Sequence, residues 1–210
     1  MRTKQKYDEK RRLVADAAIK LFLHQGVQGT SIRDIAEALE ISIGSLYYYY
    51  KSKSEIIDVV AEINSQYVDE IREYYKNLGN MSLKDALRKC IVQTVRLAHQ
   101  NRAGILFLNR DFTLLSPSRR EKLTESVRQT ISFFENLLDE GIRSGELKTE
   151  NSRMVAFNIW VLGMEWVLRR WFWEDRFTAE EFAEQQADFI LNKIVAPQVN
   201  TTTGETKCVA

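Results

Sequence analysis

The stretch that decides the fold is Gly26–Ile56, GVQGTSIRDIAEALEISIGSLYYYYKSKSEI. Ser31, Ser42 and Ser52 each precede a segment whose apolar residues recur at helical spacing. A serine at this position caps a helix, because its hydroxyl accepts a hydrogen bond from a free backbone N–H group of the first turn. The stretch therefore predicts three helix starts in close succession.

The first two of these helices are short. The run from Ser31 to Asp34 resembles a capping box, with Asp34 in place of the usual Glu or Gln. The buried face of the first short helix consists of Ile32, Ile35, Ala36 and Leu39. This helix is expected to end near Glu40, and the second to run from Ser42 to Tyr49. Two short helices joined by a tight connection form the outline of a helix-turn-helix.

The chain has few helix breakers, since only two prolines and nine glycines occur among its 210 residues. Apolar periodicity and capping signals predict further helices at Asp8–His24, Lys53–Asn77, Ser82–Gln100, Ala103–Phe112, Ser116–Gly145, Thr149–Trp173 and Thr178–Ala196. We therefore predict an all-α fold with a helix-turn-helix domain at residues 1–52, which begins with a polar, basic arm at residues 1–7. A larger helical domain at residues 53–197 and a disordered tail at residues 198–210 follow.

The charge of the chain is unevenly spread. Residues 1–53 carry a net charge of +4 and the remainder a net charge of −3, which suggests that the N-terminal part meets a polyanion. Cys90 and Cys208 lie far apart without a CxxC spacing, which fits a reducing compartment. The first residues lack an apolar signal-peptide core, and the longest apolar run, Met154–Leu168, is interrupted and too short to span a bilayer. We expect a cytoplasmic protein without a membrane partner.

Four consecutive tyrosines, Tyr47–Tyr50, end the second short helix. At about 100° per residue, four helical positions cover all sides of the cylinder, so a single core cannot bury every ring. Leu46 and Tyr50 are four residues apart and are expected to face the core together. Tyr47, Tyr48 and Tyr49 are left for other contacts.

The stretch Gly26–Ile56 resembles the DNA-binding domain of TetR/AcrR-family transcriptional regulators. The resemblance covers about 50 residues and rests on several features together. They are Gly26, the Thr30-Ser31 cap, the Ile35-Ala36 pair, the small-residue turn, Leu46-Tyr47, and Lys53 before Glu55-Ile56. It implies a ligand-responsive repressor that binds duplex DNA at a palindromic operator as a homodimer.

The resemblance and the general geometry of recognition helices indicate which residues meet DNA. Small or apolar residues at the start of the second short helix allow close approach to base edges, and helix N-termini favour phosphate. Arg33 matches a position that some members use to reach guanine, and Tyr49 replaces a usual His. The expected DNA-binding residues are Thr30, Arg33, Ser42, Ile43, Gly44, Ser45, Tyr47, Tyr48, Tyr49, Lys51 and Lys53.

The C-terminal half is expected to carry dimerisation and ligand binding. Family members pair through their last two long helices, which here are Thr149–Trp173 and Thr178–Ala196. In Met154–Leu168, 12 of 15 residues are apolar, so this helix needs cover on more than one side. A symmetric dimer provides that cover.

The segments Ile105–Leu123, Asp139–Leu147 and Gly163–Phe172 loosely resemble family members that respond to acyl-coenzyme A (acyl-CoA) thioesters. Such an effector needs an apolar tunnel for its tail and cations for its phosphates. The candidate effector-binding residues are Phe107, Arg110, Phe112, Trp160, Met164, Arg169 and Arg170. Core and dimer packing also explain many of these aromatics, and a hydrophobic drug or free fatty acid would use the same apolar lining. We expect no cofactor.

Two other classes of function remain. An enzyme is disfavoured, because His24 and His99 are isolated and no catalytic or metal-ligand spacing occurs; no catalytic or metal-binding residue is assigned. A helix-turn-helix that binds protein is disfavoured by the basic arm together with Ser45, Tyr48, Tyr49 and Lys53. Steep salt dependence of binding to duplex DNA would separate it from a DNA-binding protein.

Overall fold

The computed structural model describes the backbone of residues 2–195 and the side chains of residues 7–66 and 69–195. Within this part, the chain is helical throughout, apart from turns and a single antiparallel bridge between Leu147 and Val195. The expected all-α fold is confirmed. The expected tail at residues 198–210 and Cys208 lie outside the described residues.

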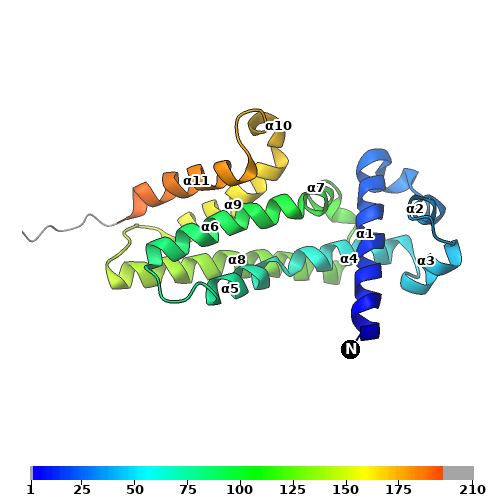
Figure 1. Cartoon of the computed structure of the whole chain (residues 1–210), viewed down its shortest axis with the longest axis horizontal. Coiled ribbons are helices and arrows are strands. Elements are labelled where there is room, and N and C mark those ends of the chain that lie inside the picture. The colour runs from blue at the N-terminus through cyan, green and yellow to red at the C-terminus, as the bar shows by residue number, and fades with distance from the viewer. Residues whose placement is uncertain (1, 196–210) are drawn as a thin grey trace, which may run out of the picture.

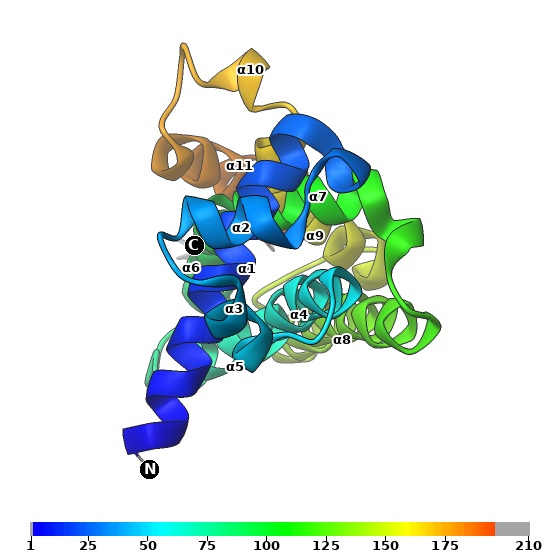
Figure 2. The same ribbon diagram turned by 90° about the vertical axis from the view of Figure 1, so that its right-hand side faces the viewer.

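The N-terminal part consists of three helices, α1 (Arg2–Gly29), α2 (Ile32–Ala38) and α3 (Ile43–Tyr49). Helix α1 crosses the long axis of the molecule, and α2 and α3 lie at one end of it (Figure 1). Figure 2 looks onto this end and shows α2 and α3 in front of the body. The first helix was expected to begin at Asp8, after an arm at residues 1–7, but α1 begins at Arg2.

The body is formed by the remaining helices. They are α4 (Lys53–Ser65), α5 (Tyr67–Lys76), α6 (Leu83–Gln100), α7 (Arg102–Asp111), the 3-10 turn η1 (Phe112–Leu114), α8 (Pro117–Ser144), α9 (Ser152–Leu168), α10 (Arg170–Trp173) and α11 (Ala179–Ile194). The long helices run roughly along the long axis of the molecule, with α4 and α8 side by side (Figures 1 and 2).

Most helix starts agree with the capping signals. The hydroxyls of Ser31, Ser42, Ser52, Ser82 and Thr178 each accept a hydrogen bond from a backbone N–H group of the following turn. Asp34 completes the capping box, because its carboxylate accepts from the backbone N–H of Ser31 at 2.7 Å. These hydrogen bonds hold the pKa of Asp34 below its ordinary value.

The expected single helix at Lys53–Asn77 is wrong, because the chain breaks it at Gln66 into α4 and α5. The side chains of Asn64 and Ser65 bond back to carbonyl groups of their own helix. The hydroxyl of Ser126, on α8, donates to the carbonyl oxygen of Ser65 at 2.8 Å, and the N–H group of Asp69 bonds to Gln66 instead. The break therefore depends on α8.

The expected helix at Thr149–Trp173 is likewise shorter and interrupted. Helix α9 begins at Ser152, after the side chain of Asn151 caps it, and ends at Leu168. Arg169 leaves the helical conformation, and the four-residue helix α10 follows.

The buried side chains form two clusters. The first joins α1, α2, α3 and the first half of α4, and it includes Phe107, Leu108 and Leu115 from the α7–α8 region. The second fills the body between α5, α6, α8, α9 and α11. Helix α4 belongs to the first cluster and also contacts α8, so it links the N-terminal helices to the body.

Candidate DNA-binding surface and ligand cavity

The N-terminus of α3 is an exposed, tightly capped turn. Ser42 accepts from the backbone N–H of Ser45 at 3.0 Å, and their two hydroxyls are 2.8 Å apart. A Cβ atom added at Gly44 would meet nothing closer than the Ser42 hydroxyl at 3.9 Å. The fold itself therefore has room for a side chain at Gly44. Its absence leaves the backbone open to close approach from outside.

The four consecutive tyrosines differ in burial, as the helical spacing predicts. Tyr50 is fully buried with Leu46 in the first cluster, and its hydroxyl donates to the carbonyl oxygen of Arg11 at 2.8 Å. Burial raises the pKa of Tyr50 to about 12, although the nearby charge of Arg11 opposes this shift. Tyr47 is 52% exposed and Tyr48 is 72% exposed. The core position predicted for Tyr50 is confirmed.

Tyr49 has a partner that the sequence did not indicate. Its ring centroid lies 5.3 Å from that of Tyr7 and 5.1 Å from that of Tyr48, and Tyr7 also contacts Tyr48 edge-on. Tyr49 is half-buried as a result. The first part of α1 thus packs against the end of α3 through these rings.

Two of the expected DNA-binding residues, Thr30 and Lys53, bond to carbonyl groups of the protein itself. Thr30 is buried, and its hydroxyl donates to the carbonyl oxygen of Gly26 at 2.8 Å, so Ser31 alone caps α2. The ammonium group of Lys53 donates to the carbonyl oxygens of Val27 and Thr30 at 2.7 and 2.9 Å. The burial of Thr30 corrects its assignment to DNA, whereas Lys53 is half-buried and its contact with phosphate stays a prediction. Both residues stabilise the connection between α1 and α2, whose free carbonyl groups require donors.

The other expected DNA-binding residues form one exposed surface at this end of the molecule. It consists of Arg33, Ser42, Ile43, Gly44, Ser45, Tyr47, Tyr48 and Lys51, with Tyr49 at its border. These residues belong to α2, to α3 and to the start of the connection after α3, at the end of the molecule that Figure 2 faces. We call this exposed surface the α3 surface.

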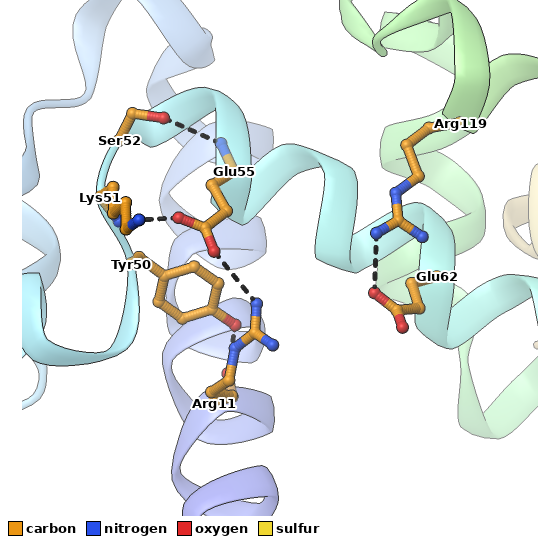
Figure 3. Close-up of polar contacts among 7 residues, drawn as sticks. All are labelled: Arg11, Tyr50, Lys51, Ser52, Glu55, Glu62 and Arg119. Atoms are coloured by element: carbon orange, nitrogen blue, oxygen red, sulfur yellow. Dashed lines mark hydrogen bonds and ion pairs between the residues drawn. The ribbon is translucent and has the colours of Figure 1, made fainter.

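Helix α4 is tied to α1 at one end and to α8 further along (Figure 3). Glu55 accepts from the backbone N–H of Lys51 at 2.8 Å and contacts the guanidinium group of Arg11 at 3.4 Å. One turn before the break, Glu62 pairs with Arg119 of α8 at 3.1 Å. A displacement of α8 would thus be transmitted to the N-terminal helices through α4.

A cavity of about 460 Å³ lies between α4, α7, η1, α8 and α9. Its apolar lining consists of Ile105, Leu108, Phe112, Leu123, Val127, Trp160, Val161, Met164 and Leu168. Its polar lining consists of Asn64, Asn109, Thr124, Ser126, Thr130 and Glu165. Glu165 is the one charged group in this lining, and it pairs with Arg169 at 2.7 Å. Such a lining suits an apolar ligand with few polar groups.

Three of the seven expected effector-binding residues, Phe112, Trp160 and Met164, line this cavity. Phe107 does not, because it is fully buried against Phe22 of α1, with ring centroids 5.5 Å apart. Phe107 is therefore a core residue, and its assignment to the effector site is corrected.

The expected arginines do not line the cavity either. Arg110 donates to the carbonyl oxygens of Phe22 and Leu23 at 2.7 and 3.2 Å, and so anchors α7 to the end of α1. Arg170 pairs with Glu174 on the surface. Only Arg169 lies near the cavity, through its ion pair with Glu165.

The sequence interpretation missed the polar lining residues. Ser126 and Thr130 are four residues apart on α8, and both are buried. The hydroxyl of Thr130 donates to the carbonyl oxygen of Ser126, and that of Ser126 to Ser65 at the α4 break. Two hydroxyl residues within an apolar stripe were the available signal for a cavity at this position.

The described residues offer neither a metal site nor a membrane-spanning helix. They contain no group of three or more His, Cys, Asp or Glu side chains arranged to hold a metal ion. None of the helices in residues 2–195 has the length and apolar character required to cross a membrane. Cys90 is buried without a disulfide partner, and burial raises the pKa of its thiol to about 12.

Comparison with known families agrees with this arrangement. Residues 14–60 match the sequence model described as bacterial regulatory proteins, tetR family. Residues 80–194, more than half of the chain, match the tetracyclin repressor-like C-terminal domain. The chain belongs to the TetR family. TetR-family regulators bind DNA and small-molecule effectors, typically as dimers.

Individual relatives are distant. The chain is 26% identical to the transcriptional repressor KstR2 of Rhodococcus jostii, over 87% of this chain and 89% of that protein. It is 24% identical to the fatty acid metabolism regulator protein of Bacillus subtilis, over 64% of this chain and 69% of that protein. The crystal structure of AibR in complex with isovaleryl coenzyme A and operator DNA shares its fold, with a TM-score of 0.69 at 18% identity over 85% and 96% of the two chains.

These relatives are transcriptional regulators and not enzymes, in agreement with the prediction from the sequence. The protein is a DNA-binding transcriptional repressor of the TetR family.

Proposed function

We propose that the protein binds a palindromic operator as a homodimer and is released from it by an acyl-coenzyme A thioester in the cavity between α4 and α8. The main observation in support of this proposal is the cavity. It is large, mostly apolar, and lined by Asn64 of α4 and by Ser126, which holds the break after α4. A ligand there would contact the helix that supports the DNA-binding helices.

The α3 surface is suited to DNA. The exposed start of α3 presents small residues to a base edge, with Tyr47 and Tyr48 beside it. Arg33 and Lys51 supply positive charge on the same face. Thr30 is left out because it is buried, and the half-buried Lys53 remains a candidate contact to phosphate.

Dimerisation is proposed through α9 and α11. These two helices carry large exposed apolar side chains: Met154, Phe157 and Phe189 are 55%, 43% and 65% exposed. A symmetric dimer would remove this apolar surface from water and place two copies of α3 on successive major-groove faces.

The names of two relatives and the apolar lining of the cavity support an acyl-CoA as the effector class. AibR is named in complex with isovaleryl coenzyme A, and the Bacillus relative is named a fatty acid metabolism regulator. The cavity, of about 460 Å³, offers Trp160, Met164 and other apolar side chains to an acyl chain. A hydrophobic compound without a thioester is the second candidate, because an apolar lining accepts both.

The DNA half is tested with an operator selected from random duplex DNA. Lys51→Gln should weaken binding to all sequences about equally and reduce the salt slope by about one unit, whereas Tyr48→Ala should change sequence preference. Arg143→Gln, an exposed change at the far end of α8, serves as the charge control. Equal effects of Lys51→Gln and Arg143→Gln would contradict the assignment of the α3 surface.

The effector half is tested by measuring operator affinity at saturating octanoyl-CoA, octanoic acid or an uncharged apolar compound. Release by octanoyl-CoA supports the proposal, and release by the uncharged compound alone supports the second candidate. Trp160→Ala should weaken the effect of whichever ligand acts, because this side chain lines the cavity. If no acyl-CoA changes operator affinity, the acyl-CoA proposal is wrong.

A further inference from the structure

A second cavity, of about 240 Å³, lies where α1 meets α4 and the turn between α6 and α7. It is lined by Arg12, Asp16, Ile19 and Lys20 of α1, by Val60, Ile63 and Asn64 of α4, and by Gln100, Asn101, Arg102, Ala103 and Gly104. Part of the lining thus comes from α1 and the rest from the body. We call it the α1 cavity.

The α1 cavity carries an excess of positive charge. Three cations, Arg12, Lys20 and Arg102, face a single acid, Asp16. None of the ion pairs among the described residues engages these cations, whereas Arg88, Arg96 and Arg119 of the body are each paired with a carboxylate. Three unpaired cations around one cleft attract an anion, and most strongly one with several charges.

Asp16 does not neutralise this charge. Arg12 and Lys20 stand four residues before and after it on the same face of α1. Desolvation raises the pKa of Asp16 above its ordinary value, and Arg12 and Lys20 oppose that shift from either side. With three cations and one acid in its lining, the cleft keeps a net positive charge whether or not Asp16 is ionised.

The α1 cavity and the apolar cavity share a wall. The side chain of Asn64 lines both of them. It lies directly over the backbone of Gly104, since a Cβ atom added at Gly104 would come within 2.5 Å of its amide nitrogen. The next residue, Ile105, already lines the apolar cavity. Asn64, packed over Gly104, therefore borders both spaces.

We propose that the two cavities bind one amphipathic ligand, with its apolar tail beside Trp160 and its phosphate or pyrophosphate head among Arg12, Lys20 and Arg102. This inference rests on the proposed effector class and names the cations that its head requires. They replace Arg110 and Arg170, which are engaged elsewhere. The ligand passes Asn64, whose amide rotates aside.

The position of the head has a consequence for DNA binding. Arg12 and Lys20 belong to α1, which packs against α2 and α3, while Arg102 belongs to the body. An anion bridging them fixes the angle between α1 and the α6–α7 turn. The ligand thereby acts on the DNA-binding helices directly, in addition to its contact with α4.

The test compares ligand binding to the wild type, the triple variant Arg12→Gln/Lys20→Gln/Arg102→Gln and the control Arg143→Gln. Binding is followed by tryptophan fluorescence and calorimetry, without DNA. The probes are octanoyl-CoA, octanoyl-pantetheine, which lacks the phosphates, and inorganic pyrophosphate. We expect the triple variant to bind octanoyl-CoA at least about tenfold more weakly with a reduced salt dependence, and octanoyl-pantetheine as the wild type does. Asp16→Asn should strengthen binding of octanoyl-CoA and pyrophosphate.

The outcomes separate the two proposals. Equal binding of octanoyl-CoA to the triple variant and to the wild type overturns the phosphate site and leaves the acyl-CoA proposal intact. Pyrophosphate that binds the wild type but not the triple variant, while no acyl compound binds, supports the phosphate site and contradicts the acyl-CoA proposal. Binding of none of the probes to the wild type overturns both.

Discussion

At the scale of single residues, Gly141 shows how tightly the body is packed. A Cβ atom added there would lie 2.4 Å from Cδ1 and 2.7 Å from Cγ of Leu147, and Leu147 is itself buried beside the end of α11. Glycine therefore allows the turn after α8 to fold back onto the helix.

Gly141→Ala should lower the free energy of unfolding by about 1–3 kcal/mol, because the buried Leu147 has to move. Gly29→Ala is the matched control: its added methyl group meets nothing closer than 3.8 Å, so we expect a change within about 0.5 kcal/mol. Urea denaturation of both variants measures the difference. Equal stabilities would show that the turn at Leu147 adapts freely.

His99 is a second residue of interest, because its environment shifts its pKa. The indole N–H of Trp166 donates to Nδ1 of His99 at 3.1 Å, which requires that nitrogen to be unprotonated. Desolvation, with the charges of Arg102 and Arg170, holds the pKa of His99 below its ordinary value. This group thus contributes stability that is present above the pKa of the unfolded chain and is lost as the pH falls through the folded pKa.

We therefore expect the wild type to lose more stability than His99→Gln between about pH 7.5 and pH 5. Urea unfolding at several pH values, with the exposed His24→Gln as a control, measures this difference. If His99→Gln keeps the pH dependence of the wild type over this range, another group is responsible.

At the scale of elements, the helix starts follow from local sequence. The capping serines and Thr178 act within one turn of their own helix, so no other part of the chain is needed to place them. Positive φ angles at Gly26, Gly79 and Gly145 also fall where the sequence predicts helix ends. The breaks at Gln66 and Arg169 carry no such local signal. The first depends on a hydrogen bond from Ser126, 61 residues away.

In the proposed mechanism a ligand acts on DNA binding through helix α4, and Glu62 is the ionic link of this helix to α8. Glu62→Gln should leave operator binding and ligand binding each nearly unchanged, but reduce the ratio of operator affinities without and with ligand by about 2- to 30-fold. Glu125→Gln removes an ion pair within α8 alone and is the control. Fluorescence anisotropy with labelled operator measures the ratio. An unchanged ratio in Glu62→Gln would exclude this link from the coupling.

At the scale of the whole molecule, the proposed dimer is needed to cover α9 and α11. Phe189→Glu should produce a monomer, because a carboxylate buried in the interface costs several kcal/mol. It should also lower operator affinity at least about 100-fold, since one α3 helix reads only half of a palindrome. Sedimentation velocity, with Leu13→Glu as an exposed apolar control on α1, tests the first expectation. A wild type that is monomeric at micromolar concentration would contradict the proposal.

The candidate ligand site could be predicted only in part, because many of its contacts join segments that are remote in sequence. Phe112, Trp160 and Met164 were predicted as ligand contacts from their apolar side chains, and all three line the cavity. The faces of Phe107 and Arg110 were not predictable, because their partners are side chains and carbonyl groups of α1, more than 80 residues earlier. The α1 cavity likewise joins three segments that are remote in sequence.

The sequence by itself determined the all-α fold, the helix-turn-helix with its caps, and the burial of Tyr50. Each of these depends on hydrogen bonds or periodicity within a few residues, which local physics specifies. The tertiary structure decided which polar groups stay free. Thr30, Lys53 and Arg110 bond to the protein itself because packing brings carbonyl groups of α1 and its following turn within their reach, and such groups require a donor.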